Sequence, residues 1–169
     1  ALYFRNNEEA IVPFYQPIVN LKTNETIGYE VLARLKYEDN YLSAGLFIDA
    51  AERMGFMQEL GKKIIEQAIR EKNGSWAKDK FFFINFSMRE AESKETIKFL
   101  KRIIRDYKVD PTKIVAEITE REAVRDINAV QNFVRELTDL EVQLAIDDFG
   151  SGFSSFLYLR YFDCNFVKI

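Results

Sequence analysis

The chain of 169 residues carries 24 basic and 27 acidic residues, a net charge of −3, and 47% of it is hydrophobic. These values predict a single globular domain with a real core. The sequence shows no basic stripe, which disfavours binding of DNA or RNA polymers, and no apolar run of about 20 residues, which disfavours membrane contact. It contains no histidine, which excludes Ser-His and Cys-His nucleophile pairs and histidine-based zinc sites.

Two further features concern the origin of the chain. Cys164 is the only cysteine, so no internal disulfide can form, which fits a reducing, cytoplasmic compartment. The first residues include neither Met nor the layout of a signal peptide, and we therefore expect a domain excised from a longer protein.

The first half of the chain is predicted to form a hairpin followed by two helices. Apolar and β-branched residues on either side of a Lys-Thr-Asn-Glu turn indicate the hairpin, and apolar residues at helical spacing indicate the helices. The expected elements are strands at 12–19 and 26–33, a helix capped by Ser43 that presents Phe47, Ala50 and Met54, and a helix over 58–72 that ends at Asn73-Gly74.

The second half of the chain alternates strands and helices, which is typical of a parallel sheet with crossover helices. The expected strands cover 81–86, 114–118, 143–147 and 165–169. The expected helices cover 93–107, 126–138 and 154–161, with Ile97, Leu100, Ile104 and Tyr107 on the inward stripe of the first and Ile127, Val130, Val134 and Leu137 on that of the second. The Phe81-Phe82-Phe83 cluster is interpreted as core rather than as a base-stacking platform.

Polar side chains stand at the ends of five of the inferred strands, where chemistry gathers in such folds. They supply four carboxylates and one amide, an all-oxygen set that suits Mg²⁺ or Mn²⁺. With two ions about 3.5–4 Å apart, one carboxylate bridges both and in-line attack on phosphate becomes the natural chemistry. The lysine of the group would balance charge or orient the attacking water. The residues are Glu30, Asn85, Glu117, Asp147 with Asp148, and Lys168.

Taken singly, each of these residues has an ordinary interpretation as a solvated charge, a helix cap or a turn residue. Their repetition at equivalent places in successive strands favours a joint metal site.

Several motifs in order resemble the EAL domain, the bacterial cyclic di-GMP phosphodiesterase family. The resemblance runs from about residue 12 to 169 and implies a TIM-type (β/α)8 barrel, here truncated to about six strands and incomplete at its C-terminal end. The family reaction is hydrolysis of cyclic di-GMP to linear pGpG. The matching segments are Phe14-Tyr15-Gln16-Pro17-Ile18-Val19, Glu30-Val31-Leu32-Ala33-Arg34, Phe47 to Glu52, Asn85-Phe86-Ser87, Glu117-Ile118-Thr119-Glu120, Asp147 to Gly152 with Ser154-Ser155, and Val167-Lys168-Ile169.

The resemblance also implies roles for individual residues. Two ions, Mg²⁺ or Mn²⁺, would be bound: the first by Glu30, Asn85, Glu117 and Asp147, the second by Asp147 as a bridge together with Asp148. Lys168 would act near the attacking water, and Gln16 and Arg34 would contact the dinucleotide. Glu120 would hold the Asp-Asp loop and link the metal site to the interface of a homodimer. The family also implies fusion to sensory or GGDEF-type domains in the parent protein.

The chain departs from the family pattern in two ways. Val31 replaces the family alanine, and because it faces away from Glu30 on a strand we expect it to be tolerated. The catalytic glutamate and the glutamine of the last two family strands, and the acid after the Lys-Ile motif, lie outside these residues. Three alternatives therefore stay open: a receptor that binds cyclic di-GMP without hydrolysis, a barrel enzyme that stabilises an enediolate on Mg²⁺, and a fragment inactive by itself.

Overall fold

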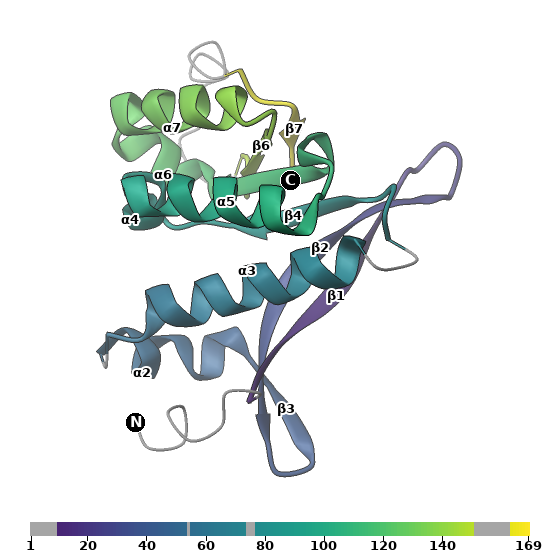
Figure 1. The fold of residues 1–169 in the computed structure, drawn as a ribbon, viewed down its shortest axis with the longest axis vertical. Coiled ribbons are helices and arrows are strands. Elements are labelled where there is room, and N and C mark those ends of the chain that lie inside the picture. Colours follow the sequence, from purple (N-terminus) through teal and green to yellow (C-terminus); the bar gives the residue numbers. More distant parts are fainter. Residues whose placement is uncertain (1–9, 54, 74–76, 151–162) are drawn as a thin grey trace.

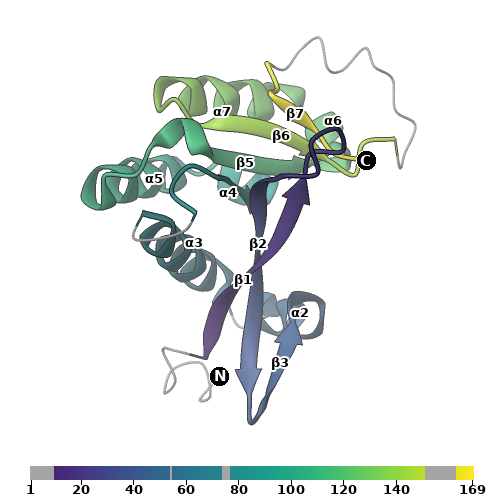
Figure 2. The same ribbon diagram turned by 90° about the vertical axis from the view of Figure 1, so that its right-hand side faces the viewer.

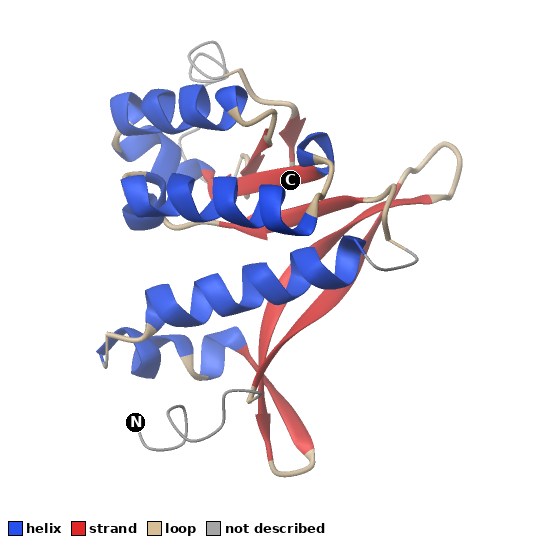
Figure 3. Cartoon of the chain, in the orientation of Figure 1, coloured by secondary structure: helices blue, strands red, loops and turns tan. Residues whose placement is uncertain are grey.

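The computed structural model describes residues 10–53, 55–73, 77–150 and 163–169. The described strands form one twisted seven-stranded sheet in the order β1-β2-β4-β5-β6-β7, with β3 paired to β2 (Figure 1). Helices α3, α5 and α7 cover one face of this sheet (Figures 1 and 3). The fold is therefore α/β, as predicted, and its strands from β2 onward to β7 run parallel along the sheet order.

The chain opens with an antiparallel hairpin that is longer than the sequence indicated. β1 (Ile11–Val19) pairs with β2 (Thr26–Tyr37), and β2 continues past the predicted end at residue 33. A two-residue turn then leads to β3 (Asn40–Ser43), which pairs with the end of β2 and was not predicted. Figure 2 shows β1 and β3 on either side of this part of β2.

The predicted helix after Ser43 is split in two. Ser43 precedes a 3₁₀ turn, η1 (Ala44–Leu46), and its side chain makes no capping hydrogen bond there. The helix α2 (Ile48–Arg53) follows; Phe47 just before it is buried as expected, but within the helix Ala51 is buried and the predicted Ala50 only partly so. The second predicted helix is confirmed as α3 (Met57–Asn73). Met54 and Gly74 lie outside the described residues.

The repeating half of the chain follows the prediction closely. Two short helices that were not predicted, α4 and α6, and the 3₁₀ turn η2 add to it. The elements are β4 (Phe81–Asn85), α4 (Met88–Ala91), α5 (Lys94–Tyr107), η2 (Pro111–Lys113), β5 (Ile114–Thr119), α6 (Glu120–Arg125), α7 (Ile127–Asp139), β6 (Gln143–Asp147) and β7 (Phe166–Val167). The helix expected over 154–161 and the loop residues Ser151 and Gly152 lie outside the described residues.

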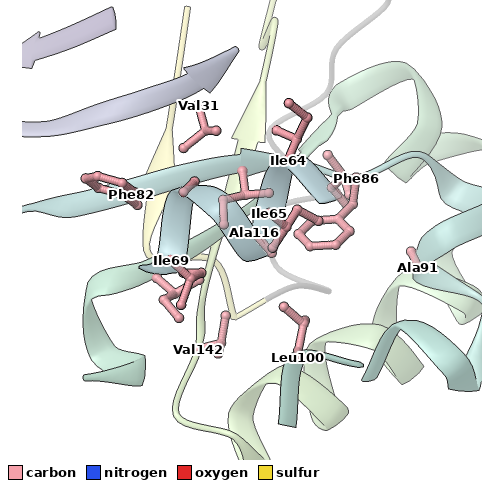
Figure 4. Packing of buried hydrophobic residues seen from close by; sticks show 14 of the residues in the cluster. Val31, Ile64, Ile65, Ile69, Phe82, Phe86, Ala91, Leu100, Ala116 and Val142 are labelled. Atoms are coloured by element: carbon pink, nitrogen blue, oxygen red, sulfur yellow. The ribbon is translucent and has the colours of Figure 1, made fainter. Parts of the chain in front are cut away.

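Alternation along the strands divides the apolar residues between the two faces of the sheet. The large cluster, which includes Phe82, Ile84 and Ala116, packs between the sheet and its helices (Figure 4). Val31 belongs to this cluster and therefore points away from the face that carries Glu30, as expected. A small second cluster of Phe83, Val115 and Ala145 lies on the opposite face. Phe82 and Phe83 of β4 are thus core residues, as predicted, whereas Phe81 is partly buried against the second cluster; Phe83 lies two residues before Asn85 on the same face.

No helix in the described part of the chain is both long and apolar enough to cross a membrane.

Candidate functional site

Five polar side chains converge on the sheet face that is opposite the helices. Asn85 and Glu117 are register partners on β4 and β5, while Glu30 lies beside Phe83 and Asp147 beside Thr119. Lys168 follows β7 directly. Because residues of one parity share a face of a sheet, the strand register brings these side chains to one place. The sequence predicted Glu30 at the end of a strand. In the structure Glu30 lies inside β2, near the end of the segment of β2 that pairs with β4.

Lys168 stands at the centre of this group. Its Nζ donates to Oε2 of Glu30 at 2.9 Å and lies 2.6 Å from Oε1 of Glu117. The same Nζ is 3.7 Å from Oδ1 of Asp147. The other carboxylate oxygen of Glu30, Oε1, accepts a hydrogen bond from Nδ2 of Asn85 at 3.0 Å. The carboxylates are therefore arranged around a cation, which here is an ammonium group.

The backbone fixes where this ammonium group lies. The amide of Lys168 donates to the carbonyl of Ile146 at 2.9 Å, and its own carbonyl accepts from the amide of Phe149 at 2.9 Å. These bonds continue the β6–β7 ladder past Val167 and tie Lys168 to the Asp147–Gly150 loop. A change in that loop would consequently displace the lysine.

Glu117 has the most unusual environment in the group. Its side chain is 0% exposed, and neither carboxylate oxygen has a hydrogen-bond partner of good geometry. Burial raises its pKa to about 7 against the lowering effect of Lys168, and Glu30 and Asp147 raise it further. For Lys168, burial alone would lower the pKa, but its contacts with Glu117 and Glu30 outweigh burial and raise it. The ammonium group is therefore held charged beside a carboxylate that is costly to ionise.

The loop after β6 places the remaining two acids differently. Asp148 adopts a positive φ of 54° and is exposed, so the chain bends there and its side chain leaves the alternation of the strand. Glu120, at the start of α6, is 6% exposed, and its Oε2 accepts from the amide of Gly150 at 2.9 Å. Glu120 is thus hydrogen-bonded to the backbone of the Asp-Asp loop and is not part of the carboxylate cluster around Lys168.

The two predicted substrate contacts lie on the same face, along the hairpin. Gln16 is exposed and is the register partner of Glu30. Arg34 lies four residues further along β2; its Nη1 donates to the carbonyl of Ala33 at 3.0 Å, and its guanidinium lies 5.5 Å from the ring centre of Phe14. The hairpin therefore extends the site from the carboxylates towards a cation and an aromatic ring.

Sequence reasoning did not single out Phe14 or the nearby Tyr41 as site residues. The signal was present for Phe14, because it lies two residues before Gln16 and must share its face. Tyr41 could not be placed, since it belongs to the unpredicted strand β3.

The donor set fits a divalent metal. Glu30, Asn85, Glu117 and Asp147 offer oxygen ligands, and the buried Oε2 of Glu117 has no hydrogen-bond partner, while its Oε1 contacts Lys168 alone at 2.6 Å among the ion pairs of the described residues. Within the described residues, no three acidic or thiol side chains lie close enough together to hold a metal ion as they stand. The acids surround Lys168 instead. For a metal ion to bind to these carboxylates, Lys168 would have to give up some of its contacts with Glu30, Glu117 or Asp147.

Comparison with known proteins places the chain in a family. The model described as EAL domain matches residues 4–169. Signaling protein YkoW of Bacillus subtilis is 34% identical over 164 residues, 95% of this chain and 20% of that protein. The probable cyclic di-GMP phosphodiesterase PdeG of Escherichia coli is 34% identical over 171 residues, 97% of this chain and 33% of that protein. The MucR phosphodiesterase of Pseudomonas aeruginosa, solved with c-di-GMP, matches with a TM-score of 0.89 at 27% identity, over 99% of this chain and 70% of that one.

The chain belongs to the EAL domain family. EAL domains are TIM-like (β/α)8 barrels, so the parallel sheet described above is part of such a barrel and the predicted fold class is confirmed. The chain spans about a fifth to a third of the length of the curated relatives it matches.

Proposed function

We propose that this chain binds cyclic di-GMP and hydrolyses it to linear pGpG at the carboxylate and lysine cluster. The observation that carries the proposal is the fully buried carboxylate of Glu117, whose oxygens have no hydrogen-bond partner of good geometry although Nζ of Lys168 lies 2.6 Å from Oε1. A buried carboxylate of this kind is costly unless a cation compensates it. Relatives that are named as cyclic di-GMP phosphodiesterases supply the substrate class.

The donor set supports a two-metal mechanism with Mg²⁺ or Mn²⁺. Glu30, Asn85, Glu117 and Asp147 would hold the first ion, and Asp147 with Asp148 the second. Divalent ions, when bound, would polarise the phosphodiester and activate water as a nucleophile.

The side chains of the chain itself would bind the substrate, orient the attacking water and position the Asp-Asp loop. Gln16 and Arg34 bind and orient the dinucleotide on the hairpin. Lys168, whose ammonium group lies among the carboxylates, would direct the attacking water by donating a hydrogen bond to it. Glu120 positions the Asp-Asp loop through the amide of Gly150. Water attacks phosphorus, the bond to the 3′ oxygen breaks, and linear pGpG results.

The test is incubation of the protein with cyclic di-GMP and Mn²⁺, followed by chromatographic detection of pGpG. We expect product from the wild type and from Glu136→Gln, a matched change on the exposed face of α7, but none from Glu30→Ala. Binding of Mn²⁺ to the two variants, measured by calorimetry, provides a second readout: Glu30→Ala should bind more weakly. Equal product from Glu30→Ala and wild type would contradict the assignment.

One observation favours a second candidate, a receptor that binds cyclic di-GMP without hydrolysing it. Lys168 already places one positive charge among the three carboxylates of Glu30, Glu117 and Asp147, so the cluster holds a cation without any metal. Tight binding of cyclic di-GMP without pGpG formation, in the presence of Mn²⁺, would support the receptor.

A further inference from the structure

A cavity lies between the sheet and its helices, on the face opposite the carboxylate cluster. It encloses about 410 Å³ and is bounded by strands β2 and β4 and by helices α2, α3 and α4. Val31, Ile64 and Phe86, which are labelled in Figure 4, belong to its wall. This volume is within the range typical of small-molecule sites, about 300–1,000 Å³. We call it the helix-side cavity.

Most of the wall of the helix-side cavity is hydrocarbon. Strand β2 contributes Val31 and Ala33, and helix α3 contributes Leu60 and Ile64. Ala33 and Gly61, two of the smallest residues in the wall, help to leave the space open. Because the transfer of apolar surface from water into such a space is favourable, the cavity suits a ligand with an apolar body.

One carboxylate oxygen in the wall lacks a partner. Glu90 of α4 is partly buried, and its Oε2 accepts hydrogen bonds from the amide and the hydroxyl of Ser87 at 2.9 and 2.7 Å. Within the described residues, its Oε1 takes part in no hydrogen bond or ion pair. A Cβ built on Gly61 of α3 would lie 3.0 Å from this Oε1, so the oxygen lies at the contact of α4 with α3.

The charges of the wall are all negative. Glu122 also lines the cavity, but both of its oxygens are occupied, Oε1 by the amide of Met88 at 3.1 Å and Oε2 by the hydroxyl of Thr119 at 2.9 Å. No lysine or arginine of the described residues belongs to the wall. A cationic head group of a ligand would therefore meet no competing cation at Oε1 of Glu90.

We propose that the helix-side cavity binds a small apolar primary amine. The hydrocarbon body of the ligand lies among the side chains of β2 and α3, and its ammonium group donates to Oε1 of Glu90. An anion of the same size is repelled by Glu90 and Glu122. Because the carboxylate cluster around Lys168 lies on the other face of the sheet, this site is independent of cyclic di-GMP hydrolysis.

The experiment uses decylamine, decanoate and butylamine as probes at neutral pH, below the concentrations at which they form micelles. Isothermal titration calorimetry measures their binding. Glu90→Gln removes the charge but keeps a residue that suits its capping position, and the exposed Glu92→Gln is its matched control. Ala33→Leu fills the cavity, because Ala33 shares the face of Val31. Its control is Gly45→Leu, where an added Cβ meets nothing within 4 Å.

Two further measurements locate the probe and verify folding. Met57 lines the cavity, whereas Met88 does not, so decylamine should shift the NMR signal of the Met57 methyl group, in protein labelled with ¹³C at the methionine methyls, more than that of Met88. Met57→Leu assigns the signal. Thermal denaturation shows which variants remain folded.

We expect the wild type to bind decylamine roughly tenfold or more tightly than decanoate or butylamine, since each of these lacks one half of the complementarity. Glu90→Gln should weaken decylamine binding by about tenfold without weakening that of decanoate. Ala33→Leu should weaken it by a similar factor, and both controls should bind as the wild type does.

Three results would overturn the inference. One is a wild type that binds no decylamine, and another is equal affinity for decylamine and decanoate, which would indicate unspecific partition of alkyl chains. The third is unchanged decylamine binding in folded Glu90→Gln, which would place the ammonium group elsewhere. That variant decides the question even if Ala33→Leu fails to fold.

Discussion

The ion pair of Glu117 with Lys168 shows at the residue scale how the site holds its charge. Glu117 is completely buried, and Lys168 approaches it to 2.6 Å. Removing one member of a buried pair leaves an uncompensated charge, which costs more than the pair contributes. The two residues should therefore be coupled in their effect on stability.

We predict that Lys168→Met lowers the free energy of unfolding by about 3 kcal/mol at pH 8, whereas Lys168→Met with Glu117→Gln recovers most of that loss. Without the ammonium group the pKa of Glu117 rises further, so the ionised carboxylate becomes more costly at this pH. Urea unfolding of the four members of the cycle measures the coupling. The exposed Lys22→Met provides the control, and a loss no larger than that of the control would contradict the prediction.

Lys72 is a second buried cation, remote from the site. It is 0% exposed, and its Nζ donates to the carbonyls of Ala77 and Lys78 at 2.9 and 2.7 Å. Burial lowers its pKa to about 8. A base whose pKa is lower in the folded state destabilises the fold wherever it is charged, below pH 8, and this penalty disappears as the pH rises to the unfolded value.

The stability difference between wild type and Lys72→Met should accordingly change with pH. We expect it to shift in favour of the wild type by up to about 3 kcal/mol between pH 8 and 10.4. Both proteins carry the same tyrosines, so the difference between them reports on Lys72. Urea unfolding at intervals across this range provides the measurement, and a constant difference would show that Lys72 titrates alike in the folded and unfolded chain.

At the scale of elements, the contact of β2 with β4 determines where Glu30 lies. Gly28 is the register partner of Phe81. A Cβ at this position would lie 2.6 Å from the carbonyl oxygen of Phe81 and 2.8 Å from its Cβ. Only glycine therefore permits the two strands to approach, and Glu30 follows two residues later on the same face.

We predict that Gly28→Ala forces β2 and β4 apart and lowers the free energy of unfolding by about 1–3 kcal/mol. The Nδ2 of Asn85 should lose its 3.0 Å hydrogen bond to Glu30 as the strands separate. Gly45→Ala is the matched control, because a Cβ there meets nothing within 4 Å. Chemical denaturation reports stability, and unchanged stability of Gly28→Ala would contradict the close approach.

The regular elements were predictable from the sequence because periodicity indicates them directly. The parallel strands and the helices α3, α5 and α7 fall where apolar spacing puts them. The inward stripe of α5 was less accurate: Thr96, Phe99, Leu100 and Ile103 are the buried residues, while Ile97, Ile104 and Tyr107 are only partly buried. Packing against the neighbouring helices rotates the buried face by about one residue relative to the pattern.

The hairpin of β2 and β3 was missed because its turn lacks the usual residues. Glu38 and Asp39 connect the strands, and Glu38 adopts a φ of 53°. Asparagine and glycine are the residues that usually indicate such a turn, so the Glu-Asp pair does not predict a hairpin. The carboxylates of the site were predictable by type, and Asp147 also by its place at a strand end, but Glu30 lies inside the longer β2 and the central placement of Lys168 depends on strand register, which no local pattern encodes.

At the scale of the whole molecule, the site is an assembly of segments that are distant in sequence. Glu30 and Lys168 are 138 residues apart yet share a hydrogen bond, and β2, β4, β5 and β6 each contribute a ligand candidate. A cation bound by this group therefore connects the hairpin to the βα units, and because its binding requires the folded register, binding should stabilise the whole chain.

We predict that Mn²⁺ at about 100 times its dissociation constant stabilises the folded chain by about 2.7 kcal/mol and raises the melting temperature by about 5–10 °C. Glu117→Gln should gain little when Mn²⁺ is added, because it lacks one of the candidate ligands, and this gain is measured against its own melting temperature in EDTA. Glu136→Gln should respond as the wild type does. Thermal denaturation in EDTA and in Mn²⁺ measures all three proteins, and an equal Mn²⁺ shift in Glu117→Gln would place the ion elsewhere. Because the readout is stability, it tests the metal site separately from hydrolysis: a shift without pGpG formation would indicate the receptor, in which the ion serves binding alone.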